Sequence, residues 1–319
     1  MAKSRKLEAL TAKLNQIQTD PTSAVGVATL AEVLDSKHSI AIARAAKLIG
    51  EYEMHALVPQ LVTTFDRLMT KTVERDPGCR AKAEIADALY RLEHQDAELF
   101  LRGLRHVQRE PVWGGQVDTA PKLRGLCALG LVRLNYPRVM VALADLLADP
   151  EPEARIGAAR AIAYSEHPLG VALLRLRLLV GDTPTVMGEC LSALLQLALE
   201  DGLPLAATLL AAGRRETDPR EAIETAEGVA LVLGESRSPA AFPILRDWWQ
   251  HTHHPELRQT ALLAIAMLRR DAAIAWLLDL LANGAPKDAK GALEALELYQ
   301  HDRALWSQVQ ARLNHRPDF

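Results

Sequence analysis

The chain has 319 residues, of which 49% are hydrophobic and only 4% aromatic, and it carries a formal net charge of −3 at pH 7. Leucine and alanine dominate, while the β-branched and aromatic residues that strands favour are scarce, so the composition predicts an all-helical protein. A slightly acidic chain has no overall attraction for nucleic-acid phosphates, and a nucleic-acid partner is therefore not expected.

The N-terminus leads into an amphipathic pattern, which predicts a capping helix over about residues 4–19 rather than the apolar core of a signal peptide. No stretch approaches the roughly 18 uninterrupted apolar residues of a membrane-spanning helix. The three cysteines, Cys79, Cys127 and Cys190, are too few and too scattered for a disulfide framework. We therefore expect a soluble, cytoplasmic protein with reduced cysteines and no membrane segment.

A motif with a nearly constant period runs along the chain. An arginine-like position is followed three and six residues later by small residues inside a leucine-rich run. The eight copies are 31 to 36 residues apart, except for one interval of 44. A fixed period of this size indicates a stacked repeat protein. The clearest copies start at Arg80, Arg124, Arg155 and Arg258, and the weaker ones at Arg44, Met187, Ile223 and Ala289.

Residues 136–165 show one repeat most clearly. Apolar residues at helical spacing predict a first helix that stops at the Asp-Pro-Glu-Pro turn of residues 149–152. A second helix follows from Arg155, and in it Ala158 and Ala161 lie one turn apart, which allows a neighbouring helix to approach closely. The same pattern predicts helix pairs at 242–250 with 258–268 and at 275–281 with 289–299.

These features together resemble the HEAT-repeat family. They are the Leu-x-x-Leu-Leu first helices, the Asp-Pro turn within a pair, the Arg-x-x-Ala-x-x-Ala second helices, and an early proline in the first helix, as at Pro59 and Pro243. The chain is similar to the bacterial type described as phycocyanobilin lyase HEAT-like repeats, over about residues 22–313.

The resemblance implies an all-α fold, a right-handed α-solenoid of about eight stacked helix pairs. Each pair buries its apolar face only by stacking on its neighbours, so we expect residues 1–319 to form a single solenoid domain that ends in a short C-terminal tail.

The interval of 44 residues contains an insertion at residues 108–118, in which Trp113 precedes Gly114 and Gly115. Insertions in repeat arrays usually map to loops on one face, and a tryptophan there is a candidate contact for a partner. The alternative is that Trp113 folds back and caps the neighbouring helix pair, and the usual burial of large apolar residues favours it. The two glycines lack the surrounding pattern of a phosphate-binding loop.

A second candidate is the segment Trp248-Trp249-Gln250-His251-Thr252-His253-His254. Imidazole is a common metal ligand, which makes the three histidines weak candidates for a metal site. No carboxylate or cysteine ligand nearby completes such a site, so we expect no metal and no other cofactor. The two adjacent tryptophans are not expected to face one core, which places one of them, with Trp249 as the candidate, at the surface or in a groove.

The third candidate is a row of carboxylates on the second helices, formed by Glu84, Asp87, Glu189, Glu224 and Glu227 together with Glu294 and Glu297. Spacings of three and four residues place each set on one helix face. If these faces align along the concave side of the stack, the acidic strip would bind a basic or polar segment of a partner protein. The alternative is that the carboxylates are the solvated side of amphipathic helices.

The recurring arginines have two interpretations as well. They could reach phosphates, but their fixed position soon after an acidic turn favours contacts with aspartates or with helix-end carbonyls inside the stack. We therefore expect Arg80, Arg124, Arg155 and Arg258 to be structural.

No catalytic set of residues emerges, so an enzyme is not the favoured class. The sequence predicts a non-catalytic scaffold that binds another protein through the concave surface and the 108–118 loop. The resemblance leaves a bilin lyase-like enzyme or chaperone acting on a phycobiliprotein as the alternative. A HEAT-like DNA glycosylase, which needs a basic concave surface, is a further alternative. The partner's identity and the oligomeric state are not determined by the pattern.

Overall fold

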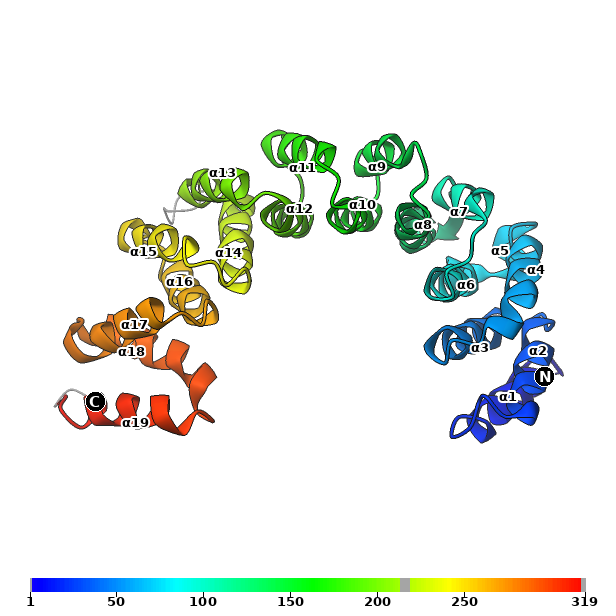
Figure 1. The fold of residues 1–319 in the computed structure, drawn as a ribbon, viewed down its shortest axis with the longest axis horizontal. Helices are drawn as coiled ribbons and strands as arrows, with labels where there is room; N and C mark the ends of the chain where they lie inside the picture. The colour runs from blue at the N-terminus through cyan, green and yellow to red at the C-terminus, as the bar shows by residue number, and fades with distance from the viewer. Residues whose placement is uncertain (1, 213–218, 317–319) are drawn as a thin grey trace. The chain divides into compact units, whose positions relative to one another are not determined.

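The computed structural model describes residues 2–212 and 219–316 (Figure 1). The chain divides into two compact units, Met1–Ser165 and Glu166–Phe319. Both units are built from stacked helix pairs, and the predicted all-α, HEAT-like solenoid fold is confirmed. That residues 1–319 behave as a single domain stays a prediction.

The N-terminal unit arranges its helices in two layers (Figure 1). The second helices α3, α6, α8 and α10 pack side by side in one layer, and the first helices α2, α4, α7 and α9 lie in the other. The elements are α1 (Ala2–Gln16), α2 (Ala24–Leu34), α3 (Ser39–Glu51), η1 (His55–Leu57), α4 (Val58–Leu68), α5 (Thr72–Arg75), η2 (Pro77–Cys79), α6 (Arg80–Arg91), α7 (Ala97–Leu104), β1 (Arg109–Val112), β2 (Gly115–Asp118), α8 (Pro121–Arg133), α9 (Val139–Leu147) and α10 (Pro152–Ser165).

The C-terminal unit repeats the same two-layer arrangement. Its second helices are α12, α14, α16 and α18, and its first helices are α11, α13, α15 and α17. The bounds are α11 (Leu169–Val180), α12 (Pro184–Leu197), α13 (Leu199–Ala211), α14 (Arg220–Glu235), α15 (Ala241–His251), α16 (Pro255–Met267), α17 (Asp271–Asn283), α18 (Pro286–Leu296), η3 (Glu297–Tyr299) and α19 (Arg303–Leu313).

Small residues explain the close packing of the second helices. A Cβ added to Gly157 of α10 would lie 2.6 Å from the Cα of Gly125 of α8, so at this point the two backbones themselves are in contact. Ala158 and Ala161 are fully buried, as the repeat motif predicts. Prolines begin α8, α12, α16 and α18, where the missing N–H group costs no hydrogen bond.

The helices predicted from periodicity are present with small shifts of their ends. The pair expected at 242–250 and 258–268 is α15 and α16, and the capping helix expected at 4–19 is α1. The tail predicted after the last repeat lies partly in residues 317–319, outside the described residues. Within the described residues, no helix has the length and apolar character needed to cross a membrane.

Candidate functional site

The insertion at residues 108–118 is the place where the structure departs from an all-helical expectation. It forms an antiparallel β-hairpin instead of an irregular loop, with Arg109 opposite Asp118 and Val112 opposite Gly115. The turn is formed by Trp113 and Gly114, and Gly114 has a φ of 92°, a conformation that a residue without a Cβ adopts without strain. The sequence Trp-Gly-Gly therefore favours a tight turn, a signal that the prediction of a loop missed.

The hairpin presents an apolar tip to solvent. The side chain of Trp113 is fully exposed at 105%, and Val112 and Val117 beside it are about half exposed. The expectation that Trp113 folds back as a cap is therefore wrong. With a fully exposed side chain, Trp113 does not pack against the helices of the unit.

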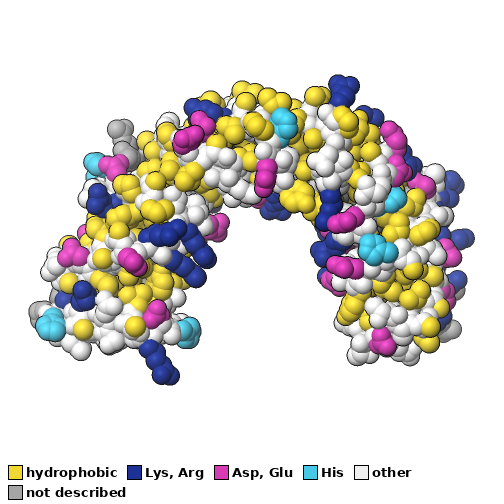
Figure 2. Space-filling view, in the orientation of Figure 1, with side chains coloured by type: hydrophobic (Ala, Val, Ile, Leu, Met, Phe, Trp, Pro, Cys, Tyr) yellow, Lys and Arg dark blue, Asp and Glu magenta, His cyan; other side chains and the backbone are white. Residues whose placement is uncertain are grey.

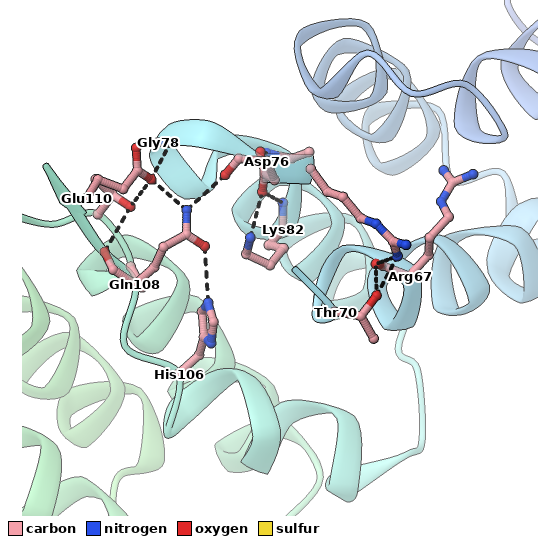
Figure 3. Close-up of polar contacts among 12 residues, drawn as sticks. Arg67, Thr70, Asp76, Gly78, Lys82, His106, Gln108 and Glu110 are labelled. Atoms are coloured by element: carbon pink, nitrogen blue, oxygen red, sulfur yellow. Dashed lines mark hydrogen bonds and ion pairs between the residues drawn. The ribbon is translucent and has the colours of Figure 1, made fainter. Parts of the chain in front are cut away.

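The base of the hairpin is fixed by Gln108 and Glu110 (Figure 3). Gln108 is buried, and its Nε2 donates hydrogen bonds to the carbonyl of Asp76 at 2.9 Å and to Glu110 Oε1 at 2.6 Å. The same Glu110 oxygen accepts from the Gly78 amide at 2.7 Å and from Thr119 Oγ1 at 2.7 Å. Three donors on one carboxylate oxygen hold the hairpin against the turn that precedes α6.

These hydrogen bonds also affect the protonation of Glu110. Burial opposes ionisation of this carboxyl group, but the hydrogen bonds from Gln108, Thr119 and the Gly78 amide, together with the charge of Lys82, outweigh burial and lower its pKa below the usual value. Glu110 is therefore held as a carboxylate, an acceptor for all three donors.

Asp76 and Lys82 form a fully buried ion pair below the hairpin (Figure 3). Both side chains have no solvent exposure, and Lys82 Nζ lies 3.2 Å from Asp76 Oδ2. The carboxylate of Asp76 also accepts hydrogen bonds from the backbone amides of Ala81 at 3.0 Å and Lys82 at 2.9 Å, so it caps the first turn of α6. An Asp-Pro turn before a second helix is part of the predicted repeat, but the burial of a lysine beside it was not predicted.

Arg124 closes the other side of the hairpin. Its guanidinium donates to Asp118 Oδ2 at 2.7 Å and to the His106 carbonyl at 3.0 Å, and it lies 2.8 Å from Asp149 of the next repeat. Burial opposes ionisation of Asp118, but hydrogen bonds from the Gln108 and Ala120 amides and from Arg124 lower its pKa. Arg124 is 2% exposed and therefore structural, as predicted.

Two further arginines of the motif follow the same rule. Arg155 donates to the carbonyls of Asp149 and Pro150 at 2.7 and 2.9 Å. Arg258 donates to the Trp249 carbonyl at 2.8 Å and to Asp288 Oδ1 of the next repeat at 2.8 Å. The motif thus links a second helix to its own turn and to the following one.

Arg80 is the exception to the structural role predicted for the arginines. It is exposed and makes no hydrogen bond or ion pair with the described residues, while Lys82 takes the buried position beside the acidic turn.

A cavity of about 420 Å³ opens next to the hairpin base on the second-helix layer of the N-terminal unit. We call it the α3–α6–α8 pocket. Sequence reasoning did not find it, because its walls come from helices that are far apart in the chain. Cationic side chains of all three helices line it, namely Arg44, Lys47, Arg80 and Lys122. Cys79, Thr119 and one carboxylate, that of Glu84, line it as well.

The thiol in the lining of the pocket is not poised for nucleophilic chemistry. Burial raises the pKa of Cys79 to about 12, so the thiol stays protonated near neutral pH. Burial also raises the pKa of Cys127, and all three cysteines are buried and free. This agrees with the prediction that they are reduced packing residues.

The predicted acidic residues are distributed over both units and several have partners. Glu84 lies 2.9 Å from Lys122, Asp87 2.8 Å from Arg91, and Glu224 2.7 Å from Arg220. Glu189 is half-buried on α12, and Glu227 is exposed on α14. Glu294 accepts from Gln259, and Glu297 lies exposed in η3. Their alignment as one partner-binding strip stays a prediction.

The Trp-Trp-His segment is packed more tightly than predicted. Trp248 and Trp249 are both buried, at 0% and 8% exposure, so the expectation that one of them faces solvent is wrong. Both can be buried because Trp249 has packing partners of its own. It packs edge-on against Trp276, at 5.2 Å between ring centroids, and the Arg258 guanidinium lies 4.2 Å from the centroid of the Trp249 ring. Trp249 is therefore not an accessible anchor.

The three histidines of this segment do not converge on one point. His251 Nδ1 lies 2.8 Å from the Asp247 carbonyl oxygen, His253 is exposed, and His254 precedes α16 at its N-cap. Among the described residues, no group of three or more histidine, cysteine, aspartate or glutamate side chains could hold a metal ion.

The chain was compared with curated proteins and with solved structures. No curated protein matches the chain. Two solved structures that resemble it are human deoxyhypusine hydroxylase in complex with glycerol and an engineered protein. The first is 16% identical, with a TM-score of 0.29 over 94% of this chain and 98% of that one. The second is 17% identical, with a TM-score of 0.29 over 89% and 96%.

Residues 206–297 match the family described as HEAT repeats. The matched stretch begins within α13 and ends at η3, so it covers successive helix pairs of the C-terminal unit. The match is confined to residues 206–297, and the helix pairs described for that stretch agree with it.

Proposed function

We propose that the protein is a non-catalytic scaffold that binds a partner protein through the tip of the 108–118 hairpin and the adjoining second-helix surface of the N-terminal unit. The observation that carries this proposal is the fully exposed Trp113 on a hairpin whose base is fixed by buried hydrogen bonds. Stacked repeats offer extended surfaces for such binding.

The rigidity of the hairpin base matters for affinity. A tryptophan on a disordered loop would lose conformational freedom on binding, whereas one on a preorganised turn loses little. The contacts of Gln108 and Glu110 restrain the hairpin before any partner arrives. Tryptophan is also among the residues that most often dominate interface energies, because it buries a large apolar area.

Site-specific photo-crosslinking tests the proposal. A photoreactive phenylalanine derivative placed at position 113 should form a covalent adduct with a specific protein in extracts of the native host. Tyr52 is the matched control position, since it is a half-exposed aromatic residue of the same unit away from the hairpin. In a quantitative binding assay with the captured protein, Trp113→Ala should weaken affinity by about thirtyfold and Tyr52→Ala by less than about twofold.

Two results would overturn the proposal. One is equal crosslinking from positions 113 and 52, which would mean that the hairpin tip has no special role. The other is an absorbance shift on mixing the purified chain with a bilin, which would instead support the lyase-like alternative implied by the sequence resemblance.

A further inference from the structure

The α3–α6–α8 pocket differs in charge from the chain as a whole. The protein has a net charge of −3, yet four cationic side chains and one carboxylate line this cavity. Basic and acidic side chains lie beside one another on the second-helix side of the N-terminal unit (Figure 2). A local excess of positive charge in a concavity attracts anionic groups, because the low-dielectric walls focus the field.

The cations of the pocket are only partly neutralised by the protein. Arg80 has no partner among the described residues, and Arg44 donates to Asn15 Oδ1 at 2.9 Å, a neutral acceptor that leaves its charge uncompensated. Lys47 lies 3.8 Å from Glu51, a loose and exposed pair. Only Lys122 has a close carboxylate, Glu84 at 2.9 Å.

The spacing of these cations suits an extended polypeptide. They belong to three helices that pack side by side, and neighbouring helices of this kind are about 8–10 Å apart. An extended chain in the polyproline II conformation has three residues per turn and rises about 3.1 Å per residue, so side chains three residues apart lie on one face and are separated by about 9 Å. Carboxylates at every third position could therefore meet cations of successive helices.

We propose that the α3–α6–α8 pocket binds an acidic segment of the partner protein in extended conformation, with carboxylates directed at Arg44, Lys47 and Arg80. This inference rests on the proposed function, because it names the chemistry of the partner. Ile40, which is 55% exposed at one edge of the pocket, supplies apolar contact next to the charges.

The composition of the pocket favours an acidic peptide over a nucleic acid. Glu84 lines the cavity, so a continuous phosphate backbone would meet a carboxylate there. No aromatic side chain lines the pocket to stack against bases. A peptide can place a neutral residue opposite this carboxylate, which a nucleic acid cannot.

Fluorescence anisotropy with the full chain tests the inference. The probe is a labelled peptide of about twelve residues, built from glycine and serine with glutamate at every third position, and its counterpart carries glutamine instead. We expect the glutamate peptide to bind about tenfold more tightly, and Arg80→Glu to weaken that binding about tenfold, with the same direction for Lys47→Glu. Arg91→Glu is the matched control, because it makes the same charge change on α6 outside the pocket.

The variants should fold, because the side chains of Arg80 and Lys47 are exposed. A thermal melting curve of each variant verifies this. Equal affinity for the two peptides would overturn the inference, as would equal losses in Arg80→Glu and Arg91→Glu. Tighter binding of a single-stranded oligonucleotide to the same pocket would also overturn it and indicate a nucleic acid.

Failure of this inference is distinguishable from failure of the proposed function. A partner crosslinked from position 113 that lacks an acidic segment would overturn the pocket assignment and leave the scaffold function intact. Peptide binding that depends on Arg80, without any partner crosslinked at position 113, would overturn the hairpin's role in the scaffold function and leave the pocket's preference for acidic segments standing.

Discussion

The two units share one architecture and differ in what they bury. Two ion pairs of the N-terminal unit have both side chains buried, Asp76 with Lys82 and Asp118 with Arg124. In the C-terminal unit the carboxylate of Asp182 is buried, but its partner Arg177 is 24% exposed. Phe242, Trp249 and Trp276 form an aromatic cluster in the C-terminal unit. Both of these buried ion pairs of the N-terminal unit lie at the ends of the 44-residue interval that breaks the period.

The difference shows what an insertion requires of a repeat stack. The hairpin lies in the connection between α7 and α8, the two helices of one pair. Gln108, Glu110 and Asp118 hold it by hydrogen bonds to the turn before α6 and to Arg124. Buried polar groups are costly unless they are fully paired, so the hairpin and the charges below it depend on one another.

The largest expected effect is on the buried ion pair. Lys82→Ala leaves Asp76 without its cation in a fully buried position, and we expect a loss of about 3–5 kcal/mol in the free energy of unfolding of the N-terminal unit. Arg258→Ala removes a partly exposed arginine in the C-terminal unit, for which we expect about 1–3 kcal/mol. Urea unfolding with hydrogen exchange of each unit measures both, and equal losses would contradict the contrast between the units.

A second comparison concerns the glycines of the second helices. In Gly157→Ala the added Cβ would lie 2.6 Å from Gly125 Cα, so α8 and α10 must separate, at a cost of about 1–3 kcal/mol. In Gly188→Ala of α12 the nearest atom is a Val232 methyl at 3.9 Å, and the gain in helix propensity should stabilise by about 0.5–1 kcal/mol. Thermal unfolding should show opposite signs, and the same sign would contradict the assigned packing.

Glu110 should make the stability of the N-terminal unit depend on pH. Because the folded-state pKa of Glu110 is below its usual value of 4.5, its stabilising contribution is present above that pH and is lost as pH falls through the lower, folded-state pKa. Glu110→Gln should cost about 1–2 kcal/mol at neutral pH, and this cost should shrink below about pH 4.5. The core variant Val229→Ala removes no titratable group, so its loss of unfolding free energy should be the same at both pH values. If the loss in Glu110→Gln is also independent of pH, the lowered pKa of Glu110 is refuted.

The smallest effect is expected at the hairpin tip. Trp113→Ala removes a fully exposed side chain and should change the unfolding free energy by less than about 0.5 kcal/mol. Trp248→Ala, in the core of the C-terminal unit, should cost about 3–5 kcal/mol. A large loss of stability in Trp113→Ala would mean that the indole packs against the unit and is not available to a partner.

Much of the architecture follows from local patterns. Prolines and acidic residues at the turns, alanines at every third position and leucines at helical spacing each act within a few residues, and they predict the helix pairs correctly. The carbonyl contacts of Arg155 are predictable for the same reason, since they reach only five and six residues back along the chain. Trp113 as a candidate contact residue also followed from sequence, through the long interval that contains it, although the pattern favoured a capping role.

The tertiary structure decided where the site lies and what it is made of. Gln108 meets Asp76 across 32 residues, and Lys122 meets Glu84 across 38, so no local pattern reports these contacts. The available sequence signal for the buried ion pair was Lys82, a lysine on the buried face of α6. This signal can be interpreted only when Asp76 is known to lie beside it. The repeat period of the sequence determined how the helices stack, because each helix packs mainly against its neighbours in the chain. The hairpin, its buried charges and the cationic pocket arose from long-range contacts that only the folded chain brings together.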